Sequence, residues 1–157
     1  MKVLLISLLL LVASGCNQFN IQSSRPDEPD LNNVLELQQQ ADKAYQEEDW
    51  PRAEKIYRQL TEKVPAQVEP WFRLGNIYAR TERLDAAVNA YRNALLRNSE
   101  SGKIWHNLGI VHLRQATNTF IDMLENTREN DPLNDRARHV VNSVTQLMAT
   151  GFGTADE

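Results

Sequence analysis

Apolar and small residues are arranged along the chain in a repeating pattern. The string Trp-x2-Leu-Gly that begins at Trp71 occurs again, with the same spacing, at Trp105, and the same offset aligns Tyr57 with Tyr91. A period of 20 to 50 residues is typical of a solenoid, in which each unit buries its apolar face against its neighbour. The pattern therefore predicts a stack of short helices, which offers a surface more readily than a catalytic pocket.

Two full units follow from this alignment, 34–67 and 68–101, and each divides into two helical halves. The predicted helices cover 34–47, 51–63, 69–81 and 84–97. Pro51 suits a first helical turn, because the N–H that proline lacks would have no partner there. The expected fold class is all-α, a short helical solenoid of about two full repeats, a degenerate third and a C-terminal capping helix.

These residues resemble the tetratricopeptide repeat, whose pattern is W-x2-L-G-x2-Y, then A-x3-F, then P. The second unit matches the pattern closely, whereas the first is a weaker copy with Leu37 in place of Trp and Ala41 in place of Gly. The resemblance implies that the matching positions build the repeat core, and it gives them no chemical role. They are Trp71, Leu74, Gly75, Tyr78, Ala87, Tyr91, Ala94, Trp105, Leu108 and Gly109.

The third unit, 102–130, departs from the pattern. His112 stands where Tyr is usual, and the Ala-x3-Phe spacing of a second helix arrives early, at Ala116. Either the turn between two helices is shortened, or one long helix runs from about 103 to 125. The second alternative is favoured, because the stretch 111–115 has no Gly or Pro to force a turn.

The segment 131–150 is predicted to be a closing helix. Ala137, Val140, Val141, Val144, Leu147 and Met148 form an apolar stripe at helical spacing. This stripe would pack on the third unit, or alternatively form a face for a partner or a second copy of the chain. Residues 151–157 are expected to be a frayed tail.

The segment 1–15 has the features of an export signal. Lys2 is followed by an apolar run that is shorter than the roughly 20 residues needed to span a bilayer, so a cleaved signal is expected rather than a permanent anchor. The stretch 11–16, Leu-Val-Ala-Ser-Gly-Cys, resembles the bacterial lipobox, in which the cysteine is acylated by fatty acids such as palmitate and becomes the first residue of the mature protein. The alternative is an ordinary secreted protein with one free thiol.

The resemblance to a lipoprotein assigns lipidation to Cys16 and a flexible tether to residues 16–33. This segment is rich in Asn, Gln, Ser, Pro and Asp, and has too little apolar surface to offset its ordering entropy. In such lipoproteins an Asp after the cysteine signals retention at the inner membrane, so Asn17 favours the outer membrane, facing the periplasm.

Charge and candidate chemistry exclude several function classes. The formal net charge of −4 provides no cationic surface for a phosphate backbone, so nucleic acid is not an expected partner. No metal site is expected, because the histidines, His106, His112 and His139, have no other ligand at metal-binding spacing. No phosphate loop, nucleophile elbow or zinc-protease motif is present, so neither a cofactor nor an enzymatic activity is expected.

A binding surface is the remaining expectation. In tetratricopeptide arrays the first helices of successive units line a concave groove that binds extended or helical peptide segments. Helix phasing against the core positions assigns to this groove Gln38, Asp42, Tyr45, Phe72, Asn76, Arg80, His106, Ile110 and Arg114. The alternative is a concave face that is simply solvated.

The sequence thus favours a lipid-anchored adaptor or scaffold of the bacterial cell envelope, with another envelope protein as its partner. By resemblance to small lipoproteins with such repeats, the client would be a pilus or secretion assembly part or a cell-wall enzyme. The alternative is a structural subunit that forms a homo-oligomer through its last helix, with the groove unused.

Overall fold

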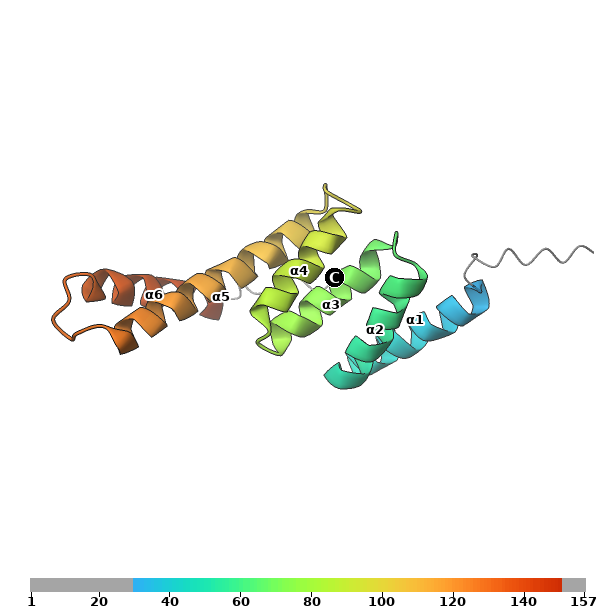
Figure 1. Cartoon of the computed structure of the whole chain (residues 1–157), viewed down its shortest axis with the longest axis horizontal. Coiled ribbons are helices and arrows are strands. Elements are labelled where there is room, and N and C mark those ends of the chain that lie inside the picture. The colour runs from blue at the N-terminus through green and yellow to red at the C-terminus, as the bar shows by residue number, and fades with distance from the viewer. Residues whose placement is uncertain (1–29, 151–157) are drawn as a thin grey trace, which may run out of the picture.

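The computed structural model describes residues 30–150, and within this range the chain forms a row of helices (Figure 1). Their bounds are α1 Leu31–Gln46, α2 Trp50–Lys63, α3 Val68–Arg80, α4 Leu84–Leu95, α5 Gly102–Asn126 and α6 Asn134–Ala149. Helices α1 to α4 stack as two antiparallel pairs, and α5 packs on the second pair. The described part of the chain is therefore an all-α helical solenoid, as the sequence predicts.

Local sequence signals set the limits of the first helices. The carboxylate of Asp30 accepts a hydrogen bond from the N–H of Asn32 at 3.1 Å, and that of Asp49 accepts one from Arg52 at 3.2 Å. Both are N-caps, which satisfy N–H groups that have no partner inside the helix. Glu48 and Glu82, which occupy the same place in the two repeats, have φ of 56° and 58° and end the first helix of each pair in the left-handed conformation.

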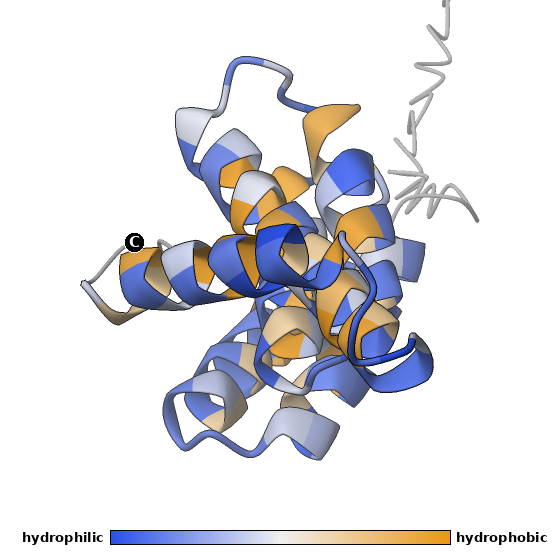
Figure 2. Ribbon diagram, turned by 90° about the vertical axis from the view of Figure 1, so that its left-hand side faces the viewer, coloured by the Kyte–Doolittle hydropathy of each residue, from blue (hydrophilic) through white to orange (hydrophobic). Residues whose placement is uncertain are grey.

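The core lies between the helices of each pair and between successive pairs. One cluster of buried side chains joins α1, α2 and α3 with Ala90 of α4, and a second joins α3, α4 and α5. Tyr57 and Tyr91, which occupy the same place in the two second helices, are both fully buried. In Figure 2 each helix carries hydrophobic and hydrophilic stretches side by side, as expected for amphipathic helices that bury one face.

Close approach of α3 and α4 depends on a glycine. A Cβ atom added to Gly75 would lie 2.4 Å from the ring of Tyr91. Real Cβ atoms essentially never come this close to another heavy atom that is not bonded to them. The tyrosine ring therefore occupies the space that any larger residue at position 75 would need. Leu74, Ala87 and Ala94 are buried around this contact, and Trp71 and Tyr78 pack against the same clusters at their edges.

The third unit consists of a single long helix. Helix α5 continues for 25 residues, so the alternative with one uninterrupted helix is the one the structure has. Its first half packs on α3 and α4, and its second half pairs with α6 in an arm that extends beyond the stack (Figure 1). Asn134 holds the connecting loop, because its side-chain amide donates to the carbonyl of Arg128 at 2.9 Å and its oxygen accepts from Thr127 at 2.9 Å.

The core assignment of Trp105 and Gly109 is wrong. Trp105 is 55% exposed, and a Cβ atom added to Gly109 would meet nothing within 4 Å. The reason is that none of the helices within residues 30–150 takes beside α5 the position that α4 takes beside α3. Leu108, one residue away, does lie in the core, because it points toward α4 and is only 5% exposed.

We expect alanine to have opposite effects at the two glycines. Gly75→Ala should lower the free energy of unfolding by about 1–3 kcal/mol, because the buried Tyr91 ring cannot yield without strain. Gly109→Ala should raise it by about 0.5–1 kcal/mol, because alanine loses less backbone entropy in a helix and meets open space. Urea unfolding of both variants measures the difference, and equal stability would contradict the packing described for Tyr91.

Candidate protein-binding groove

A hollow lies on the face formed by the first helices of the two full repeats and the start of α2. Its volume is about 490 Å³, and it is open to solvent along one side. The residues that line it are Gln38, Asp42, Tyr45, Gln46, Glu48, Trp50, Glu69, Arg73 and Arg80. The groove thus combines aromatic rings with side chains of both charges.

A repeated hydrogen bond sets the floor of this face. The hydroxyl of Tyr57 donates to the carboxylate of Asp42 at 2.6 Å, and at the same place in the next repeat Tyr91 donates to the amide oxygen of Asn76 at 2.8 Å. In each pair a tyrosine of the second helix reaches through the repeat to a polar residue of the first. Burial raises the pKa of Tyr57 well above its ordinary value, and the hydrogen bond to Asp42 raises it further.

Aromatic rings and arginines form the wall of the groove. The rings of Tyr45 and Trp50 meet edge to face with centroids 5.3 Å apart. The guanidinium of Arg73 lies 4.9 Å from the centroid of Tyr45, and that of Arg80 lies 5.6 Å from the centroid of Trp50. Arg73 also pairs with Glu69 at 2.7 Å, so its position is fixed from two sides. These contacts fix the planar guanidinium groups of the two arginines against aromatic rings in the wall of the groove.

Four residues assigned to the groove from the sequence line the hollow: Gln38, Asp42, Tyr45 and Arg80. The amide of Gln38 donates to both oxygens of Asp42, at 3.0 and 3.2 Å, so the two side chains act as one polar unit. Helix phasing was sufficient for these positions on α1, because α1 packs on only one neighbouring helix of the described chain and leaves a broad face open.

The assignment of Phe72, Asn76 and Ile110 to the groove surface is wrong, since each is only 1% exposed. Helix α3 packs on α2, α4 and α5, so its open stripe is narrower than that of α1. Phe72 lies beside Tyr91, with ring centroids 6.1 Å apart, and Asn76 accepts a second hydrogen bond from Asn107 at 3.1 Å. These residues build the inner wall of the stack.

His106 and Arg114 lie outside the hollow, on α5. His106 is half-buried. Arg114 donates to the carbonyl of Ala79 at 2.8 Å and forms an ion pair with Glu82, so it ties α5 to the end of α3. An acidic partner group would have to compete with both of these contacts.

Helix phasing missed several groove residues: Gln46, Glu48, Trp50, Glu69 and Arg73. Glu69 and Arg73 carried a signal in the sequence, because opposite charges four positions apart on a helix indicate an exposed stripe. The turn residue Glu48 and the first residue of α2, Trp50, carried none, since their place depends on how the loop folds over α1.

The described residues offer neither a metal centre nor a membrane span. Within 30–150, no three side chains of His, Cys, Asp or Glu gather as a metal ion requires. None of the helices in the same range combines the length and the apolar content that crossing a bilayer demands.

We expect the stability of the chain to fall in alkaline solution through Tyr57. The unfolded chain loses the phenol proton near its ordinary pKa of 10.0, whereas the folded chain keeps it, so stability is present below pH 10 and is lost above it. The loss is at most about 1.4 kcal/mol per pH unit. Urea unfolding between pH 8 and 11.5 should show a shallower decline for Tyr57→Phe than for the parent chain, and identical slopes would contradict this environment of Tyr57.

Comparison with known proteins agrees with the repeats seen in the fold. Residues 39–103 match the family model of the tetratricopeptide repeat, from the middle of α1 to the start of α5. The general transcriptional corepressor ssn6 of Schizosaccharomyces pombe is 33% identical over 72 residues, which cover 45% of this chain and 6% of that protein. The match thus spans a small part of that relative. Tetratricopeptide repeats are a protein-interaction fold that is generally not enzymatic, and residues 39–103 of this chain are similar to them.

Proposed function

We propose that this chain is a membrane-anchored adaptor or scaffold of the bacterial cell envelope, which holds a segment of another envelope protein in the groove between α1 and α3. The observation that carries the proposal is the groove itself, where Tyr45 and Trp50 stand next to Arg73 and Arg80 in a hollow of about 490 Å³.

The chemistry of the groove suits a polypeptide segment. Aromatic side chains and arginine are the residue types that most often dominate binding energy at protein interfaces. Gln38 and Asp42 provide polar groups that can bond to a peptide backbone at one end of the hollow. Three carboxylates and two guanidinium groups line the groove, so the segment is expected to carry charges of both signs rather than a run of one sign.

The anchor is proposed from the sequence. Cys16 and the preceding signal lie outside the described residues, so support comes from the resemblance of residues 11–16 to the lipobox. Each buried CH₂ of a lipid chain contributes about 0.8 kcal/mol, and several chains together hold a protein firmly on a bilayer. With Asn17 after the cysteine, the anchored chain would sit on the outer membrane, facing the periplasm, where pilus or secretion assembly parts and cell-wall enzymes are candidate clients.

Catalysis and transcription are not part of the proposal. The residues that line the groove include no histidine, cysteine or serine, and their carboxylates are placed beside amides and guanidinium groups as in an ordinary binding surface. The corepressor role belongs to a relative of which only 6% is covered by the match, so that name supports no more than a shared interaction fold.

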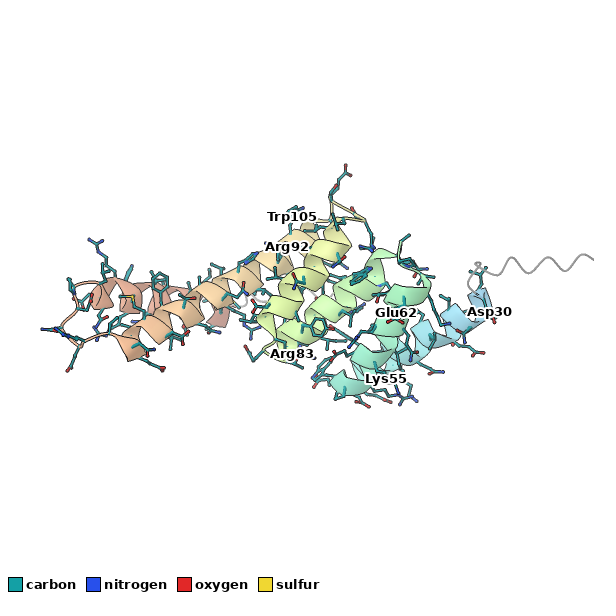
Figure 3. All side chains as sticks on the ribbon, in the orientation of Figure 1. Asp30, Lys55, Glu62, Arg83, Arg92 and Trp105 are labelled. Carbon is teal, nitrogen blue, oxygen red and sulfur yellow. The ribbon has the colours of Figure 1, made fainter. Side chains whose placement is uncertain are left out.

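Reversing one charge in the groove should remove partner binding. Arg80 is exposed and lies over Trp50, so Arg80→Glu changes the surface of the groove without entering the core. Crosslinking in cells, followed by identification of the captured proteins, should show at least a tenfold loss of the partner. The control is Lys55→Glu on the outer face of α2 (Figure 3), which should retain it. Full capture by the Arg80 variant would refute the groove as the binding site.

Loss of the acylated cysteine should release the chain from the membrane. Cys16→Ser removes the thiol that the lipid requires, so this variant is expected in the soluble fraction, whereas the parent chain is expected with outer-membrane proteins after gradient fractionation. Arg80→Glu provides the control, because it should stay with the membrane. Equal membrane association of the serine variant would contradict lipidation at this position.

A further inference from the structure

The stack ends in an open helix position. Helix α5 occupies the place of a first helix in a third repeat, but no described helix takes the second place beside it. A hollow of about 690 Å³ lies there instead, between the end of α4 and the first half of α5. We propose that this hollow, the open slot, binds one amphipathic helix of a partner protein, in the way that α4 binds beside α3.

Internal repetition identifies the slot. Its lining residues are Arg92, Leu95, Leu96, Ser99, Trp105, Leu108, Gly109 and His112. The counterparts of most of these residues in the preceding repeat line an equivalent hollow of about 460 Å³: Arg58, Thr61, Glu62, Trp71, Leu74 and Tyr78. That earlier hollow is completed by α4, through Ala86, Asn89, Ala90 and Asn93. The slot is therefore the same site with its helix missing.

Contacts around the two glycines show what is missing. At Gly75 the ring of Tyr91 lies where a Cβ would be, whereas above Gly109 the space is empty. The two tryptophans are anchored alike, because Trp71 donates to the carbonyl of Pro65 at 3.4 Å and Trp105 donates to that of Ser99 at 2.8 Å. Trp105 is thus held in the same position as Trp71 in the preceding repeat, and a helix bound in the slot would cover it.

A second contact of Trp71 defines the end of the absent helix. The guanidinium of Arg97, which follows α4, lies 4.7 Å from the Trp71 ring and also donates to the carbonyl of Pro65. Trp105 remains 55% exposed at the corresponding place. A cationic residue six positions after the aromatic residue of the incoming helix would complete the contact in the same way.

These comparisons specify the occupant. It is a helix of about three turns, like α4. It carries a small residue, an aromatic residue and a small residue at the spacing of Ala87, Tyr91 and Ala94. Thr61 and Glu62 are replaced in the slot by Leu95 and Leu96, and Leu96 is 83% exposed, so the occupant should be apolar where α4 carries Asn89 and Asn93.

Charge completes the description of the occupant. Arg92 lines the slot, and no carboxylate lies among its lining residues (Figure 3 shows Arg92 and Trp105 near the junction of α4 and α5). In the earlier hollow Arg58 shares the wall with Glu62, whose counterpart in the slot is a leucine. The wall of the slot therefore carries an arginine without an acidic neighbour in the same wall, which favours an acidic residue on the partner helix.

Other occupants fit less well. Within residues 30–150 only α4 carries the full pattern of the occupant, at Ala87, Tyr91 and Ala94, and these residues are buried in their own repeat, so a second copy would have to unfold to donate this helix. Helix α6 shares a different hollow with α5, whose lining includes Val144 and Met148 of α6 and Arg114 and Thr117 of α5. Neither 1–29 nor 151–157 contains an alanine followed four positions later by an aromatic residue.

Two synthetic peptides test the slot on the purified full chain by calorimetry. The first has the sequence of residues 83–98, and the second carries Asn89→Leu and Asn93→Leu in that sequence. We expect both peptides to bind and the leucine peptide to bind about tenfold more tightly, because its new side chains face Leu95 and Leu96. Absence of binding at about 1 mM peptide, or tighter binding of the first peptide, would overturn the proposal.

Variants of the chain locate the binding. Gly109→Leu fills the empty space above α5 and should weaken both peptides at least tenfold. Gly102→Leu is the matched control, because position 102 is also a glycine of α5 with nothing within 4 Å and lies outside the slot. Unchanged binding to the Gly109 variant overturns the proposal. So does a concentration-dependent dimer that Gly109→Leu dissociates, since the occupant would then be a second copy. Arg80→Glu should bind the peptides as the parent does, so a failure of the groove and a failure of the slot are distinguished.

Discussion

The second full repeat depends on one contact, in which Tyr91 of α4 lies against Gly75 of α3. Tyr91 fills the space above Gly75 so completely that a single added carbon would lie 2.4 Å from its ring. The ring supplies the apolar contact between the two helices. The hydroxyl orients the ring, because it donates a hydrogen bond to Asn76 at 2.8 Å. The same bond joins Tyr57 to Asp42 in the first repeat. A ring that is both packed and hydrogen-bonded fixes the distance and the rotation between two helices at once.

The groove follows from this contact. The hydroxyl of Tyr57 donates a hydrogen bond to Asp42, and this bond fixes the position of a side chain that lines the groove. Above Asp42 this leaves Tyr45, Arg73 and Arg80 to form the open face, each held by a ring or a carboxylate beside it. The groove is thus a fixed surface whose side chains have neighbours before any partner arrives, and less side-chain entropy remains to be lost on binding.

The third unit lacks this contact, and part of its core side is left exposed. At the corresponding places of the third unit, Glu125 stands where Tyr91 does in the second and Ile110 stands where Asn76 does. The third unit therefore has neither the tyrosine nor the polar residue that accepts its hydrogen bond. Helix α5 continues past the place where a turn would begin, and α6 packs on its far half. Leu96 and Trp105 stay exposed as a result. One protein therefore carries two kinds of surface, a charged and aromatic groove along the stack and an apolar slot at its end.

The residues that recur from one unit to the next were sufficient to predict the fold class, the two full repeats and most of their core, because buried positions must recur when the same packing recurs. The place of the groove could be predicted only in part. Periodicity places a residue on a helix, but the exposed stripe depends on how many neighbours the helix has, and α3 has more of them than α1.

For this reason Asp42 faces the groove, while Asn76, its counterpart in the repeat, lies under α5. The same limit explains Trp105 and Gly109, which match the core pattern in the chain but are covered by no helix of the described part. A sequence pattern states which residues are suited to be buried, and only the tertiary structure decides whether another element is there to bury them.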